Sequence, residues 1–238
     1  MISRRTFLAV TTGALLAPKL SWSEDEVPTV LDHILLGCND LDSGIGFVEE
    51  RTGVRAADGG VHPGRGTRNA LLALGERRYL EVIAPDPKQD SAQPFAAQQL
   101  ATIKGLTTPR LIGWAAHPGD VEALARKLHD AGIATQGPWP GSRARPDGRV
   151  LSWKSLVLAD DRHGLLPFFI EWSAGSVHPS VDAPTGCRLE RFAVADPDPA
   201  ALKNTFQTLG IDVPVERGDR PQLRARIVGP KGKFEVSS

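Results

Sequence analysis

The 238-residue sequence has little cysteine and no excess of charge of either sign. Its two cysteines, Cys38 and Cys187, are too few for a disulfide scaffold, and they leave open one structural disulfide or two free buried thiols. Lys and Arg together number 28, as do Asp and Glu, so the composition gives no support for a nucleic acid or a membrane surface as partner. No phosphate-binding loop or dinucleotide fingerprint occurs, so nothing in the sequence indicates a nucleotide as ligand.

A long hydrophobic run is also missing, since the uncharged stretch at residues 9–18 is too short to span a bilayer as a helix. It follows Arg4 and Arg5 in SRRTFL, and a twin arginine before a modest apolar core is the address of the twin-arginine export route. We therefore expect residues 1–26 to be an export signal and the mature protein to be periplasmic or otherwise exported, without membrane contact after signal removal. The alternative is a cytosolic protein with a chance arginine pair.

What the sequence does contain is one plan used three times, in residues 30–53, 110–132 and 188–210. Each segment has an apolar strand, an acidic helix N-cap signal, an amphipathic helix and a terminal glycine. These glycines are Gly53, Gly132 and Gly210, and their spacings of 132 − 53 = 79 and 210 − 132 = 78 indicate internal duplication. The predicted N-caps are Asp42 or Ser43, Asp120 and Asp198.

Further strands follow each predicted helix. They are expected at residues 70–74 and 78–84, at 150–158 and 166–172 after a loop at 137–149, and at 213–216, 222–228 and 233–236. Each unit therefore has the order βαβββ, and the fold class is α+β, with tandem units forming a curled, half-open mixed β barrel with helices outside. The expected boundaries are a domain at 27–175, with units at 29–85 and 110–173, and a third unit at 186–238.

The tandem plan and four segments, LDHILLGCNDLD, HPGRGTRNALLALG, RYLEVIAPDP and PFFIEW, resemble the glyoxalase-like domain family. That family belongs to the vicinal oxygen chelate superfamily, with glyoxalase I, extradiol dioxygenases and bleomycin-resistance proteins. The resemblance covers residues 29–173, with the third unit as an extension. It implies a concave pocket and a metal-dependent lyase, isomerase or dioxygenase that chelates two neighbouring oxygens of a small molecule.

The resemblance also implies metal ligands on the first and last strands of each unit, and His33, Glu81 and Glu171 occupy three of these places. Ile112 stands near the fourth, where no ligand type occurs. The implied cofactor is a divalent ion, Zn, Mn, Fe or Ni, with Glu81 and Glu171 also as catalytic residues. The alternatives are a core histidine at position 33 and carboxylates paired with arginines, because a buried charge needs a partner.

The segment HPGRGTRN is expected to be a loop that binds the substrate. It holds His62, Arg65, Arg68 and Asn69, and Arg143 lies in the equivalent loop of the second unit. Because guanidinium groups match carboxylates, the expected substrate is a small anion; the alternative is a solvated basic loop. The rival function is a metal-free protein that binds or sequesters a ligand in the same pocket. The sequence leaves a homodimer open.

Overall fold

The computed structural model describes residues 27–89, 94–145 and 148–238. The predicted export signal therefore lies outside the described residues. The described chain alternates helices and strands, which confirms the predicted α+β class. None of its helices has the length and apolar character needed to cross a membrane.

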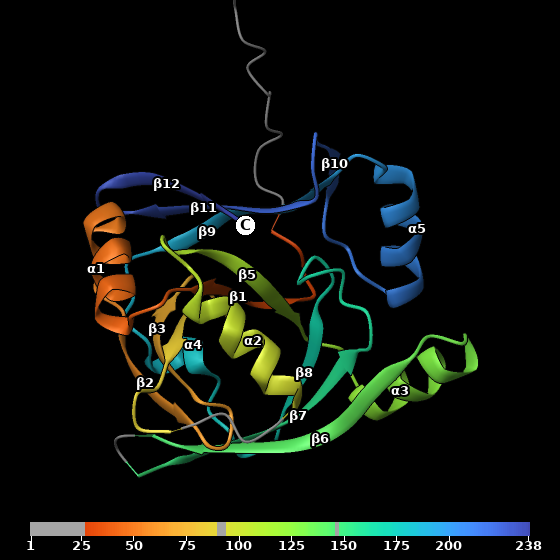
Figure 1. Cartoon of the computed structure of the whole chain (residues 1–238), viewed down its shortest axis with the longest axis horizontal. Helices are drawn as coiled ribbons and strands as arrows, with labels where there is room; N and C mark the ends of the chain where they lie inside the picture. Colours follow the sequence, from red (N-terminus) through yellow and green to blue (C-terminus); the bar gives the residue numbers. More distant parts are fainter. Residues whose placement is uncertain (1–26, 90–93, 146–147) are drawn as a thin grey trace, which may run out of the picture.

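The first unit supplies half of a large sheet (Figure 1). Its elements are β1 (Leu31–Gly37), α1 (Leu41–Thr52), β2 (Ala57–His62), β3 (Thr67–Ala73) and β4 (Tyr79–Pro85). Helix α2 (Pro94–Lys104) follows and contacts β4. The second unit repeats the order with β5 (Arg110–Ala116), α3 (Val121–Asp130), β6 (Thr135–Ala144), β7 (Val150–Leu158) and β8 (Phe168–Trp172).

The two units share one eight-stranded sheet with the order β2-β3-β4-β1-β5-β8-β7-β6. In both units the first strand is parallel to the last, β1 to β4 and β5 to β8, and the two units join where β1 and β5 run antiparallel. The edge strands β2 and β6 also contact each other, so the sheet curls until its two edges almost meet. The interior of this barrel is where the resemblance leads us to expect the pocket.

The third unit covers the outside of the barrel. After the short α4 (Pro179–Asp182) it comprises β9 (Arg188–Asp196), α5 (Pro199–Leu209), β10 (Val215–Arg217), β11 (Gln222–Gly229) and β12 (Gly232–Ser237). Its separate four-stranded sheet, β10-β9-β11-β12, lies above the barrel in Figure 1. The rings of Trp114 and Phe192 pack 5.3 Å apart, and those of Phe47 and Phe234 5.7 Å apart, so the core continues from the barrel into this unit.

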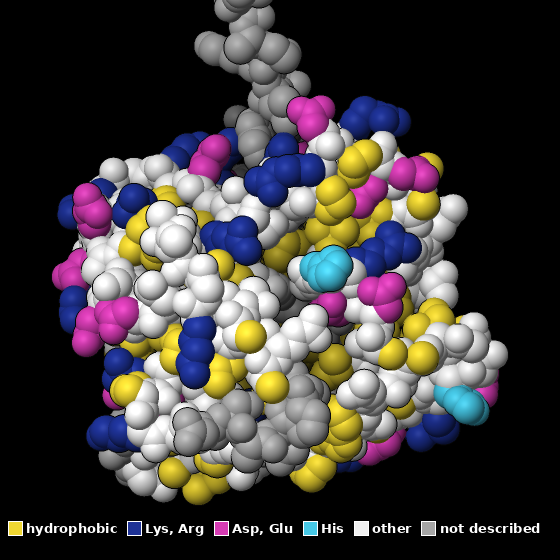
Figure 2. Space-filling model, in the orientation of Figure 1, with side chains coloured by type: hydrophobic (Ala, Val, Ile, Leu, Met, Phe, Trp, Pro, Cys, Tyr) yellow, Lys and Arg dark blue, Asp and Glu magenta, His cyan; other side chains and the backbone are white. Residues whose placement is uncertain are grey.

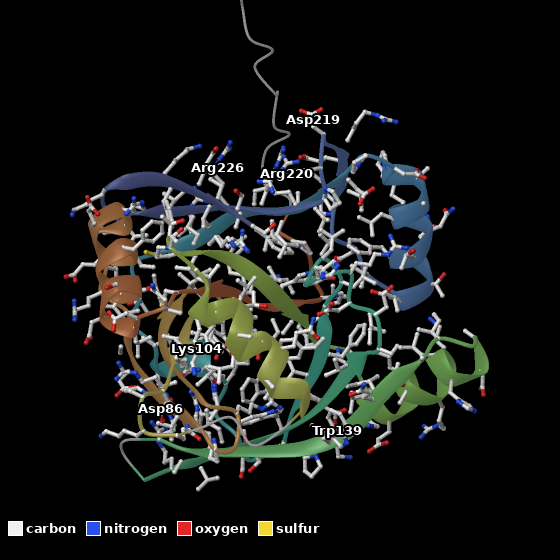
Figure 3. The ribbon with its side chains drawn as sticks, in the orientation of Figure 1. Asp86, Lys104, Trp139, Asp219, Arg220 and Arg226 are labelled. Atoms are coloured by element: carbon white, nitrogen blue, oxygen red, sulfur yellow. The ribbon has the colours of Figure 1, made fainter. Side chains whose placement is uncertain are left out.

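The outer surface carries charges of both signs side by side. On the face shown in Figure 2, basic and acidic side chains alternate without a large area of one sign. On the four-stranded sheet of the third unit, Arg226 donates to Glu235 over 2.8 Å, and Figure 3 shows Arg226 at the top of the molecule, far from Trp139 on β6. Several charged residues of this sheet are therefore paired at the surface.

Two local predictions were wrong. The N-cap of α1 is Asp40, whose side chain accepts from the Ser43 amide over 2.8 Å, and neither Asp42 nor Ser43 takes this place, because the helix begins at the buried Leu41. The expected loop at 137–149 is mostly strand β6. Its prolines suggested a loop, but β6 is an edge strand, where a residue without an N–H is tolerated.

Candidate active site

Glu81 lies in the interior of the barrel, on the side of β4 opposite the outer core. The parallel register of β1 and β4 brings His33 beside it, with His33 Nε2 3.5 Å from Glu81 Oε2. The other oxygen, Oε1, is 3.4 Å from Nε2 of His62 and accepts from Asn69 Nδ2 over 2.5 Å. Only 7% of Glu81 is exposed, so two imidazoles and an amide take the place of water around this carboxylate.

The ring of His33 is held by two aromatic rings and by a bond at its Nδ1. It stacks on Tyr79 with centroids 4.4 Å apart, and Phe168 packs edge-on at 5.5 Å. Its Nδ1 is 2.7 Å from Oδ1 of Asp32. Because an ionised carboxylate only accepts, Nδ1 carries the hydrogen, and Nε2 points at Glu81.

Asp32 reaches the interior through a β-bulge. Between Leu31 and His33 the register of β1 against β5 slips, so the extra residue is Asp32. A bulge re-aims side chains, and here it lets two consecutive residues, Asp32 and His33, bond to each other in the interior. Asp32 was not among the predicted site residues, because strict alternation along the strand assigns its side chain to the other face. The signal was an acid beside a histidine in an otherwise apolar strand.

These contacts shift the pKa values of the buried groups. Burial opposes ionisation of Glu81, but its contacts with His33, His62 and Asn69 outweigh burial and lower its pKa to about 2. Burial likewise opposes protonation of His33, yet its bonds to Asp32 and Glu81 raise its pKa to about 9. At neutral pH His33 is therefore an imidazolium between two carboxylates. Burial lowers the pKa of His62 to about 4, so His62 is neutral.

The second unit reaches this site from the opposite edge of the sheet. Arg143 on β6 donates from Nη1 to Asn69 Oδ1 over 2.5 Å, across the gap between β6 and the first unit. Gly59 on β2 makes this approach possible, since a Cβ there would collide with Asn69 Oδ1 and lie 3.0 Å from Arg143 Nη1. The predicted residues Asn69 and Arg143 therefore belong to one arrangement.

Arg65 is also brought to the interior. Burial lowers its pKa, and it lies close enough for its charge to act on Glu81 and on His62. The cations His33, Arg65 and Arg143 thus outnumber the two carboxylates around them. An anion is the ligand charge that such surroundings favour.

Glu171 does not join the site, which corrects the prediction of a shared cluster of His33, Glu81 and Glu171. Its Oε2 accepts from the Val121 amide over 2.7 Å, at the start of α3 on the outside of the sheet. A negative charge is stabilised at a helix N-terminus. In β8 the residues that share the interior face are instead Phe168, Ile170 and Trp172.

Arg68 is also misplaced in the prediction. It lies in β3 rather than in a loop, and the alternation of the strand turns it to the side opposite Asn69. Its charge acts on the pKa values of Cys38, Asp40 and Asp86, which belong to the region around α1. Both cysteines of the chain are free and buried.

The predicted metal set does not fit the structure as it stands, because Glu171 points away from the other two residues. Throughout the described ranges, no group of three or more His, Cys, Asp or Glu side chains is arranged to hold a metal ion. His33 and Glu81 do converge. The side chain of Asn69, however, is bonded to Glu81 and lies 3.1 Å from His62 Nε2, so an amide nitrogen occupies the place beside them. We therefore derive no step through a metal.

The curled eight-stranded sheet built from two βαβββ units is the fold that the sequence resemblance implied. The chain belongs to the glyoxalase-like domain family, whose model matches residues 31–232. No curated protein matches the sequence significantly.

One solved structure shares the fold over most of the chain, and others resemble it over a smaller part. A hypothetical protein from Staphylococcus aureus matches with a TM-score of 0.60 and 19% identity, over 87% of each chain. Methylmalonyl-CoA epimerase from Streptomyces coelicolor, in complex with 2-nitronate-propionyl-CoA, overlaps 63% of this chain and 99% of its own at 21% identity and a TM-score of 0.42. The epimerase from Mycobacterium tuberculosis overlaps 61% and 87% at 20% identity and a TM-score of 0.40.

Proposed function

We propose that this protein is an enzyme that moves a proton on a carbon next to a carbonyl group of a small anion. One observation carries the proposal: the buried Glu81 carboxylate has an imidazole at each of its two oxygens, in an interior where cations outnumber anions. A carboxylate can accept the carbon-bound proton, and the His33 N–H can stabilise the enolate oxygen that forms.

The contacts of Glu81 suit such a base. Its pKa of about 2 is low while His33 faces it. A substrate oxygen that takes over the His33 N–H would leave Glu81 buried with one partner fewer, and burial raises the pKa of a carboxyl group. Substrate binding would thus make Glu81 a stronger base. Arg65 and Arg143 would hold the anionic end of the substrate.

The interior also has room at Gly113, two strands away from Glu81. Gly113 on β5 is buried and pairs with Leu35, which in turn pairs with Glu81 across β1 and β4. A Cβ at Gly113 would meet no atom within 4 Å. A small molecule beside Gly113 would lie on the same stretch of the sheet as Glu81 and His33.

Exchange of carbon-bound hydrogen tests the proposal. Pyruvate is incubated with the protein in D2O, after chelation and after addition of Zn, Mn, Fe or Ni, and deuterium in its methyl group is followed by NMR. We expect the protein to exchange hydrogen faster than the background rate. The Glu81→Gln variant should lose this extra exchange, and the Glu171→Gln variant should retain it. The metal additions test the cofactor that the family resemblance implies. Absence of exchange under every condition would contradict the proposal for a keto acid.

A metal-free binding protein is the second candidate. The observation that favours it is the apolar interior face of β8, where Phe168, Ile170 and Trp172 stand instead of acid–base groups. A pocket wall of this kind holds a ligand without reacting with it. Calorimetry with pyruvate and with oxalate, a planar dianion, distinguishes the two functions: binding without hydrogen exchange supports this candidate.

We further propose that the protein is exported by the twin-arginine route, from the sequence SRRTFL at its N-terminus. Cells expressing the chain with Arg4→Lys/Arg5→Lys are fractionated beside cells expressing the unaltered chain and a Lys19→Arg control. We expect the double variant alone to stay in the cytosol. Equal cytosolic retention of all three would contradict export.

A further inference from the structure

The connector between the second and third units, residues 173–187, lies against the barrel interior. Ala183 packs with Leu71, Ala73 and Tyr79, and the Ala73 amide donates to the carbonyl of Pro184 over 2.9 Å. Tyr79 is the residue on which His33 stacks. The connector is therefore part of the surroundings of the candidate active site.

Two sets of polar contacts hold the connector to the hairpin of the second unit. The side chain of Ser176 bonds to both the amide and the carbonyl of Ser152 on β7, over 2.8 and 2.9 Å. At the other end Asp182 pairs with Arg145 and with Arg149. Because the segment is fixed on both sides of α4, the side chains between these contacts have defined positions.

His178 is the connector residue that reaches the site. It is 6% exposed, its Nε2 lies 3.2 Å from Oδ2 of Asp32, and its Nδ1 lies 2.8 Å from Oγ of Ser180. The ring packs edge-on against Tyr79 and Trp172, each at 5.6 Å. Since the carboxylate only accepts, Nε2 of His178 donates to Asp32, and Nδ1 accepts from Ser180.

Asp32 is thereby oriented by three donors. Trp172 Nε1 donates to Oδ2 over 3.0 Å beside His178, which leaves Oδ1 for His33 Nδ1 at 2.7 Å. The direction of the His33 ring depends on this last bond, because Nε2 faces Glu81 only while Nδ1 faces Asp32. A shift of the Asp32 carboxylate would therefore turn His33 away from Glu81.

We propose that His178 is a positioning residue for the candidate active site, which acts by holding Asp32 and through it the ring of His33. It touches neither Glu81 nor the open space beside Gly113 in the contacts described above. The effect of His178 on reaction rate rests on the proposed proton transfer. Its effect on the orientation of the His33 ring does not depend on that proposal.

A matched pair of substitutions tests this role. In His178→Gln the amide nitrogen stands as many bonds from Cα as Nε2 of histidine, so it can still donate to Asp32. In His178→Asn the side chain reaches only as far as Nδ1, so it keeps the neighbourhood of Ser180 and loses Asp32. We expect the Asn variant to lower kcat of pyruvate hydrogen exchange by roughly 10- to 100-fold with KM changed less than about threefold, and the Gln variant to stay within about threefold in both.

The second readout is independent of turnover. In protein with 15N-labelled histidine, the Nδ1–H of His33 hydrogen-bonded to Asp32 gives a slowly exchanging proton resonance, assigned by its loss in His33→Gln. We expect this resonance to persist in His178→Gln and in a His129→Asn control on α3, and to broaden or disappear in His178→Asn. If the wild-type protein does not catalyse hydrogen exchange on pyruvate, the His33 resonance alone decides the inference. An unchanged resonance in the Asn variant overturns it, as does equal loss in the Gln variant.

Discussion

The first and second units have the same element order but unlike interiors. On the interior face of its last strand, the first unit places Tyr79 and Glu81, whereas the second unit places Phe168, Ile170 and Trp172. On the first strands, β1 carries His33, and the residue of β5 that pairs with it is Ala115. The acid–base groups are thus concentrated in one half of the barrel.

This difference shows what a repeated unit preserves. The outer faces of both halves must pack against helices and the third unit, and both are apolar there. The interior faces carry no such requirement, so the residue at a corresponding place can be a base in one unit and a wall in the other. The position of a residue in a repeat predicts which strand carries it, but the register of that strand decides whether its side chain faces the interior or the outside of the barrel.

Replacing the glutamate of each unit by glutamine, in separate variants, provides the sharpest test of this comparison. Glu81→Gln is expected to lower the rate of pyruvate hydrogen exchange by about 10²–10⁴-fold, because it removes the base. Glu171→Gln should leave that rate within about twofold, since Glu171 contacts the α3 N-terminus instead of the site. Kinetics of both variants under identical conditions check this prediction, and similar losses would mean that the two units share the chemistry.

Asp32→Ala is expected to destabilise the fold by about 3–5 kcal/mol, because it removes one partner of a buried ion pair. Asp32 is completely buried and accepts from His33, His178 and Trp172, so three donors would lose their acceptor. Urea unfolding measures the change. Asp219→Ala, at an exposed turn, serves as the control and should change stability by less than about 0.5 kcal/mol.

The stability of the metal-free protein should be greatest near pH 6.5. The pKa of Glu81 falls to about 2 on folding, so its contribution is present above 4.5 and is lost as pH falls toward 2. The pKa of His33 rises to about 9, so its contribution is present below 6.5 and is lost as pH rises through 9. The pKa of His62 is lowered from 6.5 to about 4 on folding, so the unfolded chain takes up this proton first and stability already falls as pH drops from 6.5 toward 4.

Each limb should amount to a few kcal/mol, on the order of 1.4 kcal/mol per unit of pKa shift. Both limbs involve the same contact between His33 and Glu81, so they do not add independently. Unfolding in urea at a series of pH values measures them. In Glu81→Gln the alkaline limb should shrink, since His33 keeps only Asp32 as its anionic partner, and an unchanged limb would show that His33 is not the titrating group.

The smallest expected effect concerns the closure of the two halves. Gly59→Ala should cost about 1–3 kcal/mol, because the new methyl group collides with Asn69 and crowds Arg143. Gly46→Ala in α1 is the matched control, since a Cβ there meets no atom within 4 Å and should stabilise the helix by about 0.5–1 kcal/mol. If both variants unfold alike, β2 and β6 are not held together as described.

Residues of the site differ in how far the sequence could predict them. Glu81 was found because a carboxylate in an apolar strand needs a partner, and His33 because the family resemblance implies a ligand at its place on the first strand. Asp32 escaped because its place inside depends on a bulge, and His178 because the connector has no periodic pattern. Glu171 was assigned to the wrong face because a residue's place in a strand does not reveal the register of that strand against its neighbours.

The sequence by itself determined the three βαβββ units, their helix-capping residues at Asp120 and Asp198, and the membership of the family. These depend on local periodicity, capping and turn chemistry, which neighbouring residues specify among themselves. The tertiary structure decided which polar residues meet: Asp32 with His178 from 146 positions away, and Asn69 with Arg143 from 74. Such contacts depend on strand register and on the closing of the barrel, which only the packing of the whole chain establishes.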